Sequence, residues 1–243
     1  FVRMQHDERC FFFIADYHSL TTHPDPGMLH VNVKSVLCEY LAAGLDPDVA
    51  TIYVQSDVPE VAELSLLLGM HAFVGELERT ASVKEKIRKP PDNVNIGLLS
   101  YPVLMAADIL QHRATRVPVG KDQEQHLELT RDIAIRFNNL YGDVFTIPEA
   151  YIGKAGAKIM SLQDPAKKMS KSDENPNGSI YLMDDPDTII RKCKRAVTDS
   201  EGAVRYRDEQ PGIKNLIDIY CACPGCVPAD VEREFDGKGY GDF

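Results

Sequence analysis

The sequence of 243 residues lacks the long apolar stretches that membrane-spanning helices need. No run reaches the roughly 18 apolar residues of a transmembrane helix, and no basic segment followed by a short apolar core marks a secretory signal. We therefore expect a cytoplasmic protein with no membrane partner. The chain starts at Phe1 rather than at a methionine, which suggests a missing or cut N-terminus and weakens the argument from the absent signal.

Positive charge is also scarce. The 27 Lys and Arg residues stand against 37 Asp and Glu residues, which gives a formal net charge of −10. Because an acidic surface repels polyanions, any contact with nucleic acid must come from a local basic patch. The best cluster is Arg191-Lys192-x-Lys194-Arg195, although on sequence alone we favour a solvated helix face.

Cysteine is too infrequent, at six residues, to indicate a disulfide framework in a cytoplasmic chain. One stretch is nevertheless unusual. Cys221-Ala-Cys223-Pro-Gly-Cys226 has the Pro-Gly turn of a metal-binding loop, and with Cys193 it could form a four-thiolate site for zinc or an iron–sulphur cluster. Unliganded cysteines are the interpretation that we favour.

Alternating strand and helix patterns predict the fold. Three segments rich in β-branched or aromatic residues are expected to be buried parallel strands: Cys10–Ala15, Thr51–Val54 and Arg116–Val119. Helical patterns are predicted over Asp25–Leu41, Val61–Leu68 and Pro102–His112, and again from Asp187 and Pro211. This alternation is typical of an α/β domain with a doubly wound parallel sheet, followed here by the start of a helical part.

Polar residues follow each predicted strand. They are Asp16, Tyr17 and His18 after the first strand, Gln55 and Ser56 after the second, and Gly120 to Gln123 after the third. Ligands of open α/β sheets bind outside the carboxyl ends of the strands, so these loops are expected to line one crevice. The alternative is that strand ends are polar simply because they meet water.

The stretch from Lys154 to Asn177 has little apolar periodicity, and we interpret it as a long mobile loop. Within it, Lys168 and Lys171 flank Met169 and Ser170. Lysine ammonium groups on flexible stems act as movable point charges that suit a triphosphate. Charge alone would still favour a solvated basic loop.

The exact string Lys168-Met-Ser-Lys-Ser172 changes this balance, because KMSKS resembles the second signature of class I aminoacyl-tRNA synthetases. Four further stretches accompany it: Tyr101–Asp108 (YPVLMAAD), Val117–His126 (VPVGKDQEQH), Gly156–Ser161 (GAKIMS) and Ala196–Ser200 (AVTDS). Together they resemble the bacterial and organellar tryptophanyl-tRNA synthetases over the whole chain. The resemblance implies a Rossmann-like catalytic domain over residues 1–185 and the truncated start of a helical tRNA- and anticodon-binding domain over 186–243.

The resemblance also implies a set of ATP contacts, with Mg²⁺ as the accompanying ion. Lys168 and Lys171 are expected to hold the β- and γ-phosphates, and Lys86 to reach the triphosphate. Ile159 and Met160 are expected to lie against adenine. The remaining implied ATP-binding residues are Gly120, Asp122, Gln123, Met169, Ser170 and Ser172.

Asp108 is the most informative residue for the second substrate, because it lies in an almost wholly apolar helical pattern. A buried carboxylate is costly unless something hydrogen-bonds it, and the generic partner is an arginine or a helix N-terminus. The functional partner would be the indole N–H of tryptophan, which can only donate. The resemblance assigns Asp108 this role, with the other pocket residues being Met105, Val117, Val119 and His18, and with Tyr101 and Gln123 on the α-amino group.

The expected activity is that of a tryptophan–tRNA ligase: activation of L-tryptophan with ATP, then transfer to tRNA(Trp), in a homodimer. The chain departs from the family in lacking the HIGH-like first signature, which should precede Phe1. Some bacterial members carry an iron–sulphur cluster; Cys193, Cys223 and Cys226 keep its outer spacings, but Leu216 occupies the remaining position. A sister tyrosyl enzyme and a non-charging paralogue that senses tryptophan or ATP remain open alternatives.

Overall fold

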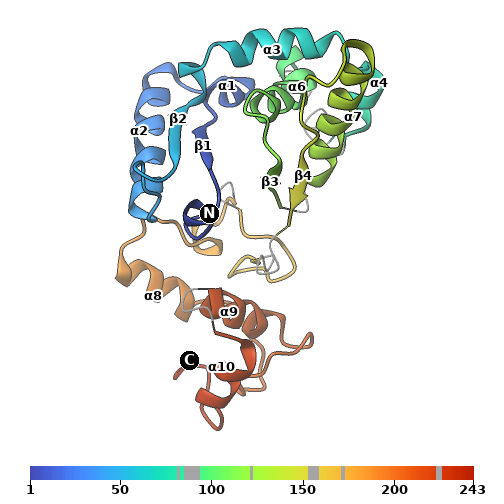
Figure 1. Cartoon of the computed structure of the whole chain (residues 1–243). Coiled ribbons are helices and arrows are strands. Elements are labelled where there is room, and N and C mark those ends of the chain that lie inside the picture. The colour runs from blue at the N-terminus through green and yellow to red at the C-terminus, as the bar shows by residue number, and fades with distance from the viewer. Residues whose placement is uncertain (81–82, 85–93, 121–122, 153–158, 171–172, 223–225) are drawn as a thin grey trace. The chain divides into compact units, whose positions relative to one another are not determined.

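The computed structural model describes residues 1–80, 83–84, 94–120, 123–152, 159–170, 173–222 and 226–243 (Figure 1). Five of the predicted site residues lie outside these ranges: Lys86, Asp122, Lys171, Ser172 and Cys223. The chain divides into two compact units, Phe1–Gly153 and Lys154–Phe243. The predicted functional division between residues 185 and 186 stays a prediction.

The first strand pair of the N-terminal unit is built as predicted. β1 (Phe11–Ile14) and β2 (Thr51–Val54) run parallel, with Phe11 opposite Thr51. Between them lie η2 (Leu20–Thr22) and the crossover helix α2 (Pro26–Ala42). Helix α2 begins where the Asp25 carboxylate accepts a hydrogen bond from the backbone N–H of Met28, which satisfies one of the donors that a helix start leaves unpaired.

The second strand pair repeats this arrangement. β3 (Arg116–Pro118) runs parallel to β4 (Glu149–Tyr151), and α7 (Glu124–Tyr141) connects them. Helix α7 ends at Gly142, whose φ of 92° is a conformation that favours glycine. Strand β4 was not predicted, because its three residues are exposed and carry no apolar pattern.

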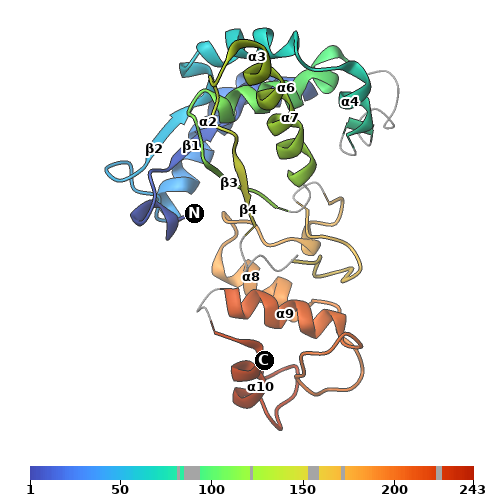
Figure 2. The same ribbon diagram turned by 45° about the vertical axis from the view of Figure 1, so that its right-hand side comes forward.

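Four helices form the apolar core of the N-terminal unit. α6 (Ile96–Leu110) packs between α3 (Glu60–Gly69) and α7, as Figures 1 and 2 show, and α4 (Val74–Arg79) packs on α6. The buried side chains of this core are Val61, Leu68, Leu77, Val103, Ala106, Ala107, Leu110, Leu129, Ile133 and Ala134. The predicted start of α6 at Pro102 was wrong, because Asn95 caps an earlier start by accepting from the N–H of Leu98 and the helix tolerates Pro102 in its interior.

The parallel crossovers agree with a Rossmann-like, doubly wound architecture, but the described strands form two pairs rather than one continuous sheet. β1 pairs with β2 and β3 pairs with β4, so β1 and β3 each keep one edge without a partner strand among the described residues. A cavity of about 620 Å³ is lined by β1, the end of α6 and β3.

The C-terminal unit contains η6 (Pro176–Gly178) and three helices that each begin with a proline, a residue pre-set for the first helical turn: α8 (Pro186–Lys194), α9 (Pro211–Ala222) and α10 (Pro228–Glu234). Helices α9 and α10 bury a small core of Val204, Ile213, Ile217, Val231 and Phe235. Across the described parts of both units, no helix has the length and apolarity to cross a bilayer.

Candidate active site

Asp108 lies near the end of α6 and is only 3% exposed. Its carboxylate accepts hydrogen bonds from the side-chain amide of Gln55, at 2.8 Å to Oδ1 and 3.0 Å to Oδ2. The Nε2 of His18 lies 2.9 Å from Oδ2. The generic expectation of an arginine or a helix N-terminus was therefore wrong; the partners are Gln55 and His18, a residue predicted to lie near the same pocket.

The loops that follow β1 and β2 are joined by hydrogen bonds. In α1 (Asp16–Ser19), the Oδ1 of Asp16 accepts from the backbone N–H groups of Tyr17, at 3.0 Å, and Ser56, at 3.1 Å. Gln55, at the start of η3 (Gln55–Asp57), also accepts from the Tyr17 N–H, at 3.1 Å. These contacts confirm that the first two polar loops meet at one end of the strand pair.

Tyr101 connects this network to the start of α7. Its buried hydroxyl lies 3.0 Å from the Nε2 of His126, in the first turn of α7, and its ring lies 6.4 Å from that of His18. Gln123, half-buried, is the N-cap residue of α7. The predicted contacts Tyr101 and Gln123 thus belong to the same end of the unit as His18, whereas His126 was not singled out.

The cavity beside β1 is lined by Asp108 and by Val117, one of the predicted pocket walls. Met105 and Val119 are half-buried but do not line this cavity, and Gly120 is exposed at the end of β3. The structure therefore brings Asp108 and Val117 to one cavity and leaves the placement of Met105 and Val119 in a pocket a prediction.

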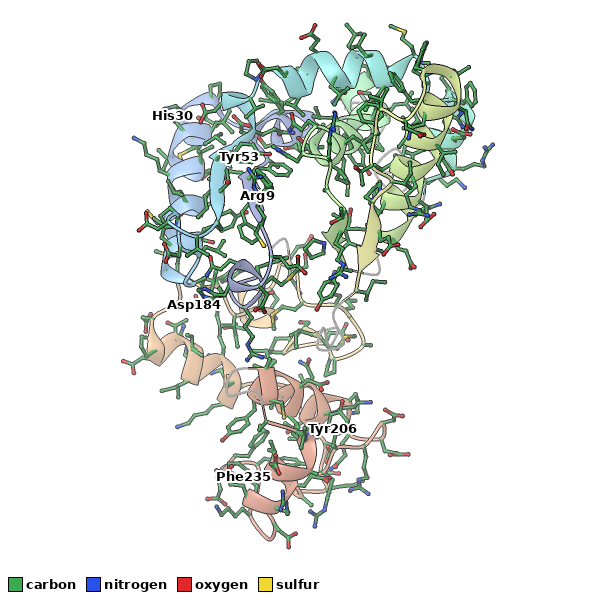
Figure 3. The ribbon with its side chains drawn as sticks, in the orientation of Figure 1. Arg9, His30, Tyr53, Asp184, Tyr206 and Phe235 are labelled. Atoms are coloured by element: carbon green, nitrogen blue, oxygen red, sulfur yellow. The ribbon has the colours of Figure 1, made fainter. Side chains whose placement is uncertain are left out.

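His112 borders the cavity and was not singled out in the sequence. The His112 ring stacks on Phe11 at 4.5 Å, and its Nε2 lies 2.6 Å from the hydroxyl of Tyr53, which is labelled in Figure 3. Burial raises the pKa of Tyr53 to about 12, so the phenol keeps its proton and donates to His112. Burial also lowers the pKa of His112, which favours the neutral ring.

The KMSKS stretch begins as one arm of a hairpin in the C-terminal unit. Met160 pairs with Lys168, and the backbone N–H of Met169 donates to the carbonyl of Ile159 at 3.0 Å. The Asn215 side chain, on α9, holds Met160 from the other side: Oδ1 accepts from its N–H at 2.7 Å and Nδ2 donates to its carbonyl at 2.8 Å. Ile159 and Met160 are thus joined to Lys168 and Met169 by an antiparallel bridge, and Met160 is hydrogen-bonded to α9.

The residues on either side of Lys168 make further contacts within the C-terminal unit. Lys167 forms an ion pair with Asp164 at 3.0 Å, and the Lys168 side chain is exposed. The carbonyl of Ser170 accepts a hydrogen bond from the Ser179 hydroxyl at 2.8 Å. The backbone at Ser170 is therefore anchored directly before the second lysine of the signature.

The predicted thiolate site is only partly assembled. The Sγ atoms of Cys221 and Cys226 lie 3.5 Å apart, and burial raises the pKa of the Cys221 thiol to about 11. Burial likewise raises the pKa of Cys193. No group of three or more metal-binding side chains forms among the residues that the structure describes, and Cys223 lies outside them.

The basic cluster of α8 separates into two parts. Lys192 is 4% exposed; its ammonium donates to Asp184 at 2.6 Å and to the Ser179 carbonyl at 2.9 Å (Asp184 is labelled in Figure 3). Arg191, Lys194 and Arg195 are exposed. The solvated-face interpretation was wrong for Lys192 and stays a prediction for the three exposed residues.

The model of the family "tRNA synthetases class I (W and Y)" matches residues 1–242. The chain belongs to this family of class I tRNA synthetases. A similar relative is a tryptophan–tRNA ligase of Clostridium perfringens, which is 53% identical over 241 residues, covering 99% of this chain and 73% of the relative. The alignment places this class I synthetase chain across most of the relative's length.

Solved structures agree with this assignment. The fold of this class I synthetase resembles tryptophanyl-tRNA synthetase from Mycoplasma pneumoniae with a TM-score of 0.89 at 38% identity, covering 99% of this chain and 74% of the other. It resembles the Campylobacter jejuni enzyme complexed with ADP and tryptophan with a TM-score of 0.80 at 36% identity, over 99% and 74% of the two chains. The predicted family and fold class are confirmed.

Proposed function

We infer that this protein activates L-tryptophan with ATP, giving tryptophanyl-adenylate and pyrophosphate, and then transfers tryptophan to tRNA(Trp). The observation that carries this inference is the 53% identity to a tryptophan–tRNA ligase across nearly the whole chain. The buried Asp108 acceptor at a cavity supports an amino acid whose aromatic side chain carries a hydrogen-bond donor. The cytoplasmic location stays a prediction.

Asp108 would accept the indole N–H, which phenylalanine lacks, while the shape of the pocket would reject tyrosine. Sites built around one specific hydrogen bond discriminate strongly, because an analogue without the donor leaves a buried group unpaired. The pocket would be completed by Met105, Val117, Val119 and His18, with Tyr101 and Gln123 on the α-amino group. The hydrogen bonds from Gln55 and His18 hold the Asp108 carboxylate in one rotamer.

The chemistry requires no protein nucleophile. The tryptophan carboxylate attacks the α-phosphorus of ATP in line, the bond from that phosphorus to the α,β-bridging oxygen breaks, and pyrophosphate leaves with that oxygen. Catalysis is then mainly positioning plus stabilisation of phosphate charge by Mg²⁺ and by Lys168, Lys171 and Lys86. Ile159 and Met160 would lie against adenine, and closure of the KMSKS stretch is the expected gating motion. The other proposed ATP contacts are Gly120, Asp122, Gln123, Met169, Ser170 and Ser172.

Amino-acid-dependent pyrophosphate exchange tests the function directly. We expect exchange with tryptophan and little with tyrosine; the reverse preference would identify the sister enzyme, and no exchange would favour a sensor.

Lys171→Ala should slow adenylate formation far more than it weakens tryptophan binding. Asp108→Ala should abolish the preference for tryptophan, and retained preference would remove Asp108 from the pocket.

The proposed homodimer is supported by an exposed apolar surface on α3 and α4. Leu66 and Met70 are 63% and 71% exposed, and Leu67, Phe73 and Val74 are exposed beside them in the chain. Contiguous apolar patches of this kind mark interfaces. Met70→Glu should shift the sedimentation coefficient from dimer to monomer, whereas Leu182→Glu, at a residue 76% exposed in the other unit, should not. A protein that sediments as a monomer before any change would refute the proposal.

Contact with tRNA is proposed for the exposed cations of α8. Arg191, Lys194 and Arg195 offer a local positive surface in a chain whose net charge is −10. Phosphate contacts weaken with salt, so the triple alanine variant should bind tRNA more weakly and with a shallower salt dependence. An unchanged salt slope would leave these residues as a solvated helix face.

A metal or iron–sulphur cluster at the cysteines has little support. The described residues bring two thiols together, Cys221 and Cys226, which is fewer than a cluster requires. No step of the reaction is assigned to such a group. Iron and zinc analysis of anaerobically purified protein, with a visible absorption spectrum, decides between a cluster and unliganded cysteines.

A further inference from the structure

Gln55 is fully buried between the end of β2 and Asp108 on α6. Its amide nitrogen donates to both carboxylate oxygens of Asp108, at 2.8 and 3.0 Å. Its amide oxygen accepts from the backbone N–H of Tyr17 at 3.1 Å. The amide nitrogen of Gln55 therefore has acceptors as partners, and its amide oxygen has a donor as partner.

The orientation of the Gln55 amide is determined by chemistry. The Tyr17 N–H can only donate, so it faces the amide oxygen, and both Asp108 carboxylate oxygens accept from the amide nitrogen. Tyr17 is itself fixed, because its N–H also lies 3.0 Å from the Oδ1 of Asp16, which holds the N–H of Ser56. The backbone of two loops thus sets the direction from which Asp108 receives its hydrogen bond.

The hydrogen bonds of Asp108 leave acceptor capacity on one oxygen. A carboxylate has about four acceptor positions, two on each oxygen. Oδ2 receives both Gln55 and His18, whereas Oδ1 receives Gln55 alone among the described contacts. Since Asp108 also lines the cavity of about 620 Å³, an incoming N–H donor would meet a carboxylate whose rotamer is already fixed.

We propose that Gln55 is a positioning residue for side-chain selectivity, holding Asp108 in the one orientation from which it can accept an N–H of the aromatic substrate. This inference rests on the proposed function. It concerns the discrimination between aromatic side chains with and without a donor, and it leaves the phosphate chemistry untouched. Preorganised acceptors discriminate better than free ones because no reorganisation is needed when the ligand binds.

The test compares tryptophan with β-(3-benzothienyl)alanine, in which sulphur replaces the indole N–H at nearly the same shape. The measured quantity is the ratio of kcat/KM for the two amino acids in pyrophosphate exchange. Gln55→Met keeps the length of the side chain and removes all three of its hydrogen bonds, two to Asp108 and one to Tyr17. We expect it to reduce the ratio by about tenfold or more, since hydrogen bonds to charged groups are among the stronger ones.

Gln5→Met is the matched control. Gln5 is also a buried glutamine that joins two segments, donating to the Gly44 carbonyl at 2.9 Å and accepting from the Asp46 N–H at 2.9 Å. Its replacement should lower the melting temperature and leave the ratio unchanged. If Gln55→Met does not fold, Gln55→Asn, which is too short to span Tyr17 and Asp108, provides the same measurement.

The outcomes are separable. A Gln55 variant that melts at lower temperature but keeps the full ratio would make Gln55 a structural residue and overturn the inference. A wild-type protein without tryptophan-dependent exchange would instead refute the proposed function. Loss of the ratio in Gln55→Met but not in Gln5→Met supports the positioning role.

Discussion

Replacing Asn215 with alanine is expected to remove the hydrogen bonds that join the backbone of Met160 to α9. The Asn215 side chain is buried and makes two hydrogen bonds to the backbone of Met160, at 2.7 and 2.8 Å. Alanine removes both and leaves a partly buried N–H and carbonyl without these partners. Because a hydrogen bond contributes roughly 0.5–1.5 kcal/mol and a buried unpaired group costs roughly 1–3 kcal/mol, the free energy of unfolding should fall by about 2–3 kcal/mol.

Urea denaturation measures this change, and pyrophosphate exchange at varied ATP measures its effect on the site. If Met160 contacts adenine as proposed, the KM for ATP should rise roughly tenfold, equivalent to about 1.4 kcal/mol, while the KM for tryptophan stays constant. Lys214→Ala is the control on the same helix, because its ammonium pairs with the exposed Asp208 and such pairs contribute under about 1 kcal/mol. Equal stability losses in Asn215→Ala and Lys214→Ala would refute the reasoning.

Three further changes probe the packing of both units. Gly212→Ala would place a Cβ 2.0 Å from the Val197 carbonyl oxygen, so thermal unfolding should report a loss of roughly 3 kcal/mol or more, and a small loss would contradict the close approach. Burial lowers the pKa of His112, so the free energy of unfolding should fall as pH drops below about 6.5, less steeply in His112→Gln; identical pH profiles would exclude this residue. The hydrogen bond from Lys192 lowers the pKa of Asp184. The ionised Asp184 therefore adds to the free energy of unfolding above the usual aspartate pKa, and this stabilisation is lost as the pH falls through the lowered pKa of the folded state. Urea midpoints of Lys192→Met and wild type should differ at neutral pH and converge in acid.

The sequence by itself determined the features that depend on neighbouring residues. The strand at Thr51–Val54 has its predicted bounds, and α2 lies within one residue of its predicted bounds at each end, because propensity and periodicity are local. The family was also evident in the sequence, since the KMSKS string is contiguous. Asp108 was predicted to be buried from the apolar residues around it in the chain, and it is.

Only the tertiary structure decided which polar groups meet across long sequence distances. Gln55 and Asp108 are 53 residues apart, and Asn215 and Met160 are 55 apart, so no local pattern links either pair. Lys192 lay in a basic run that looks solvated in sequence, yet packing buries it against Asp184 because an ion pair compensates its desolvation. Such choices depend on how the elements pack, since the cost of burying a polar group depends on the partner that the fold brings to it.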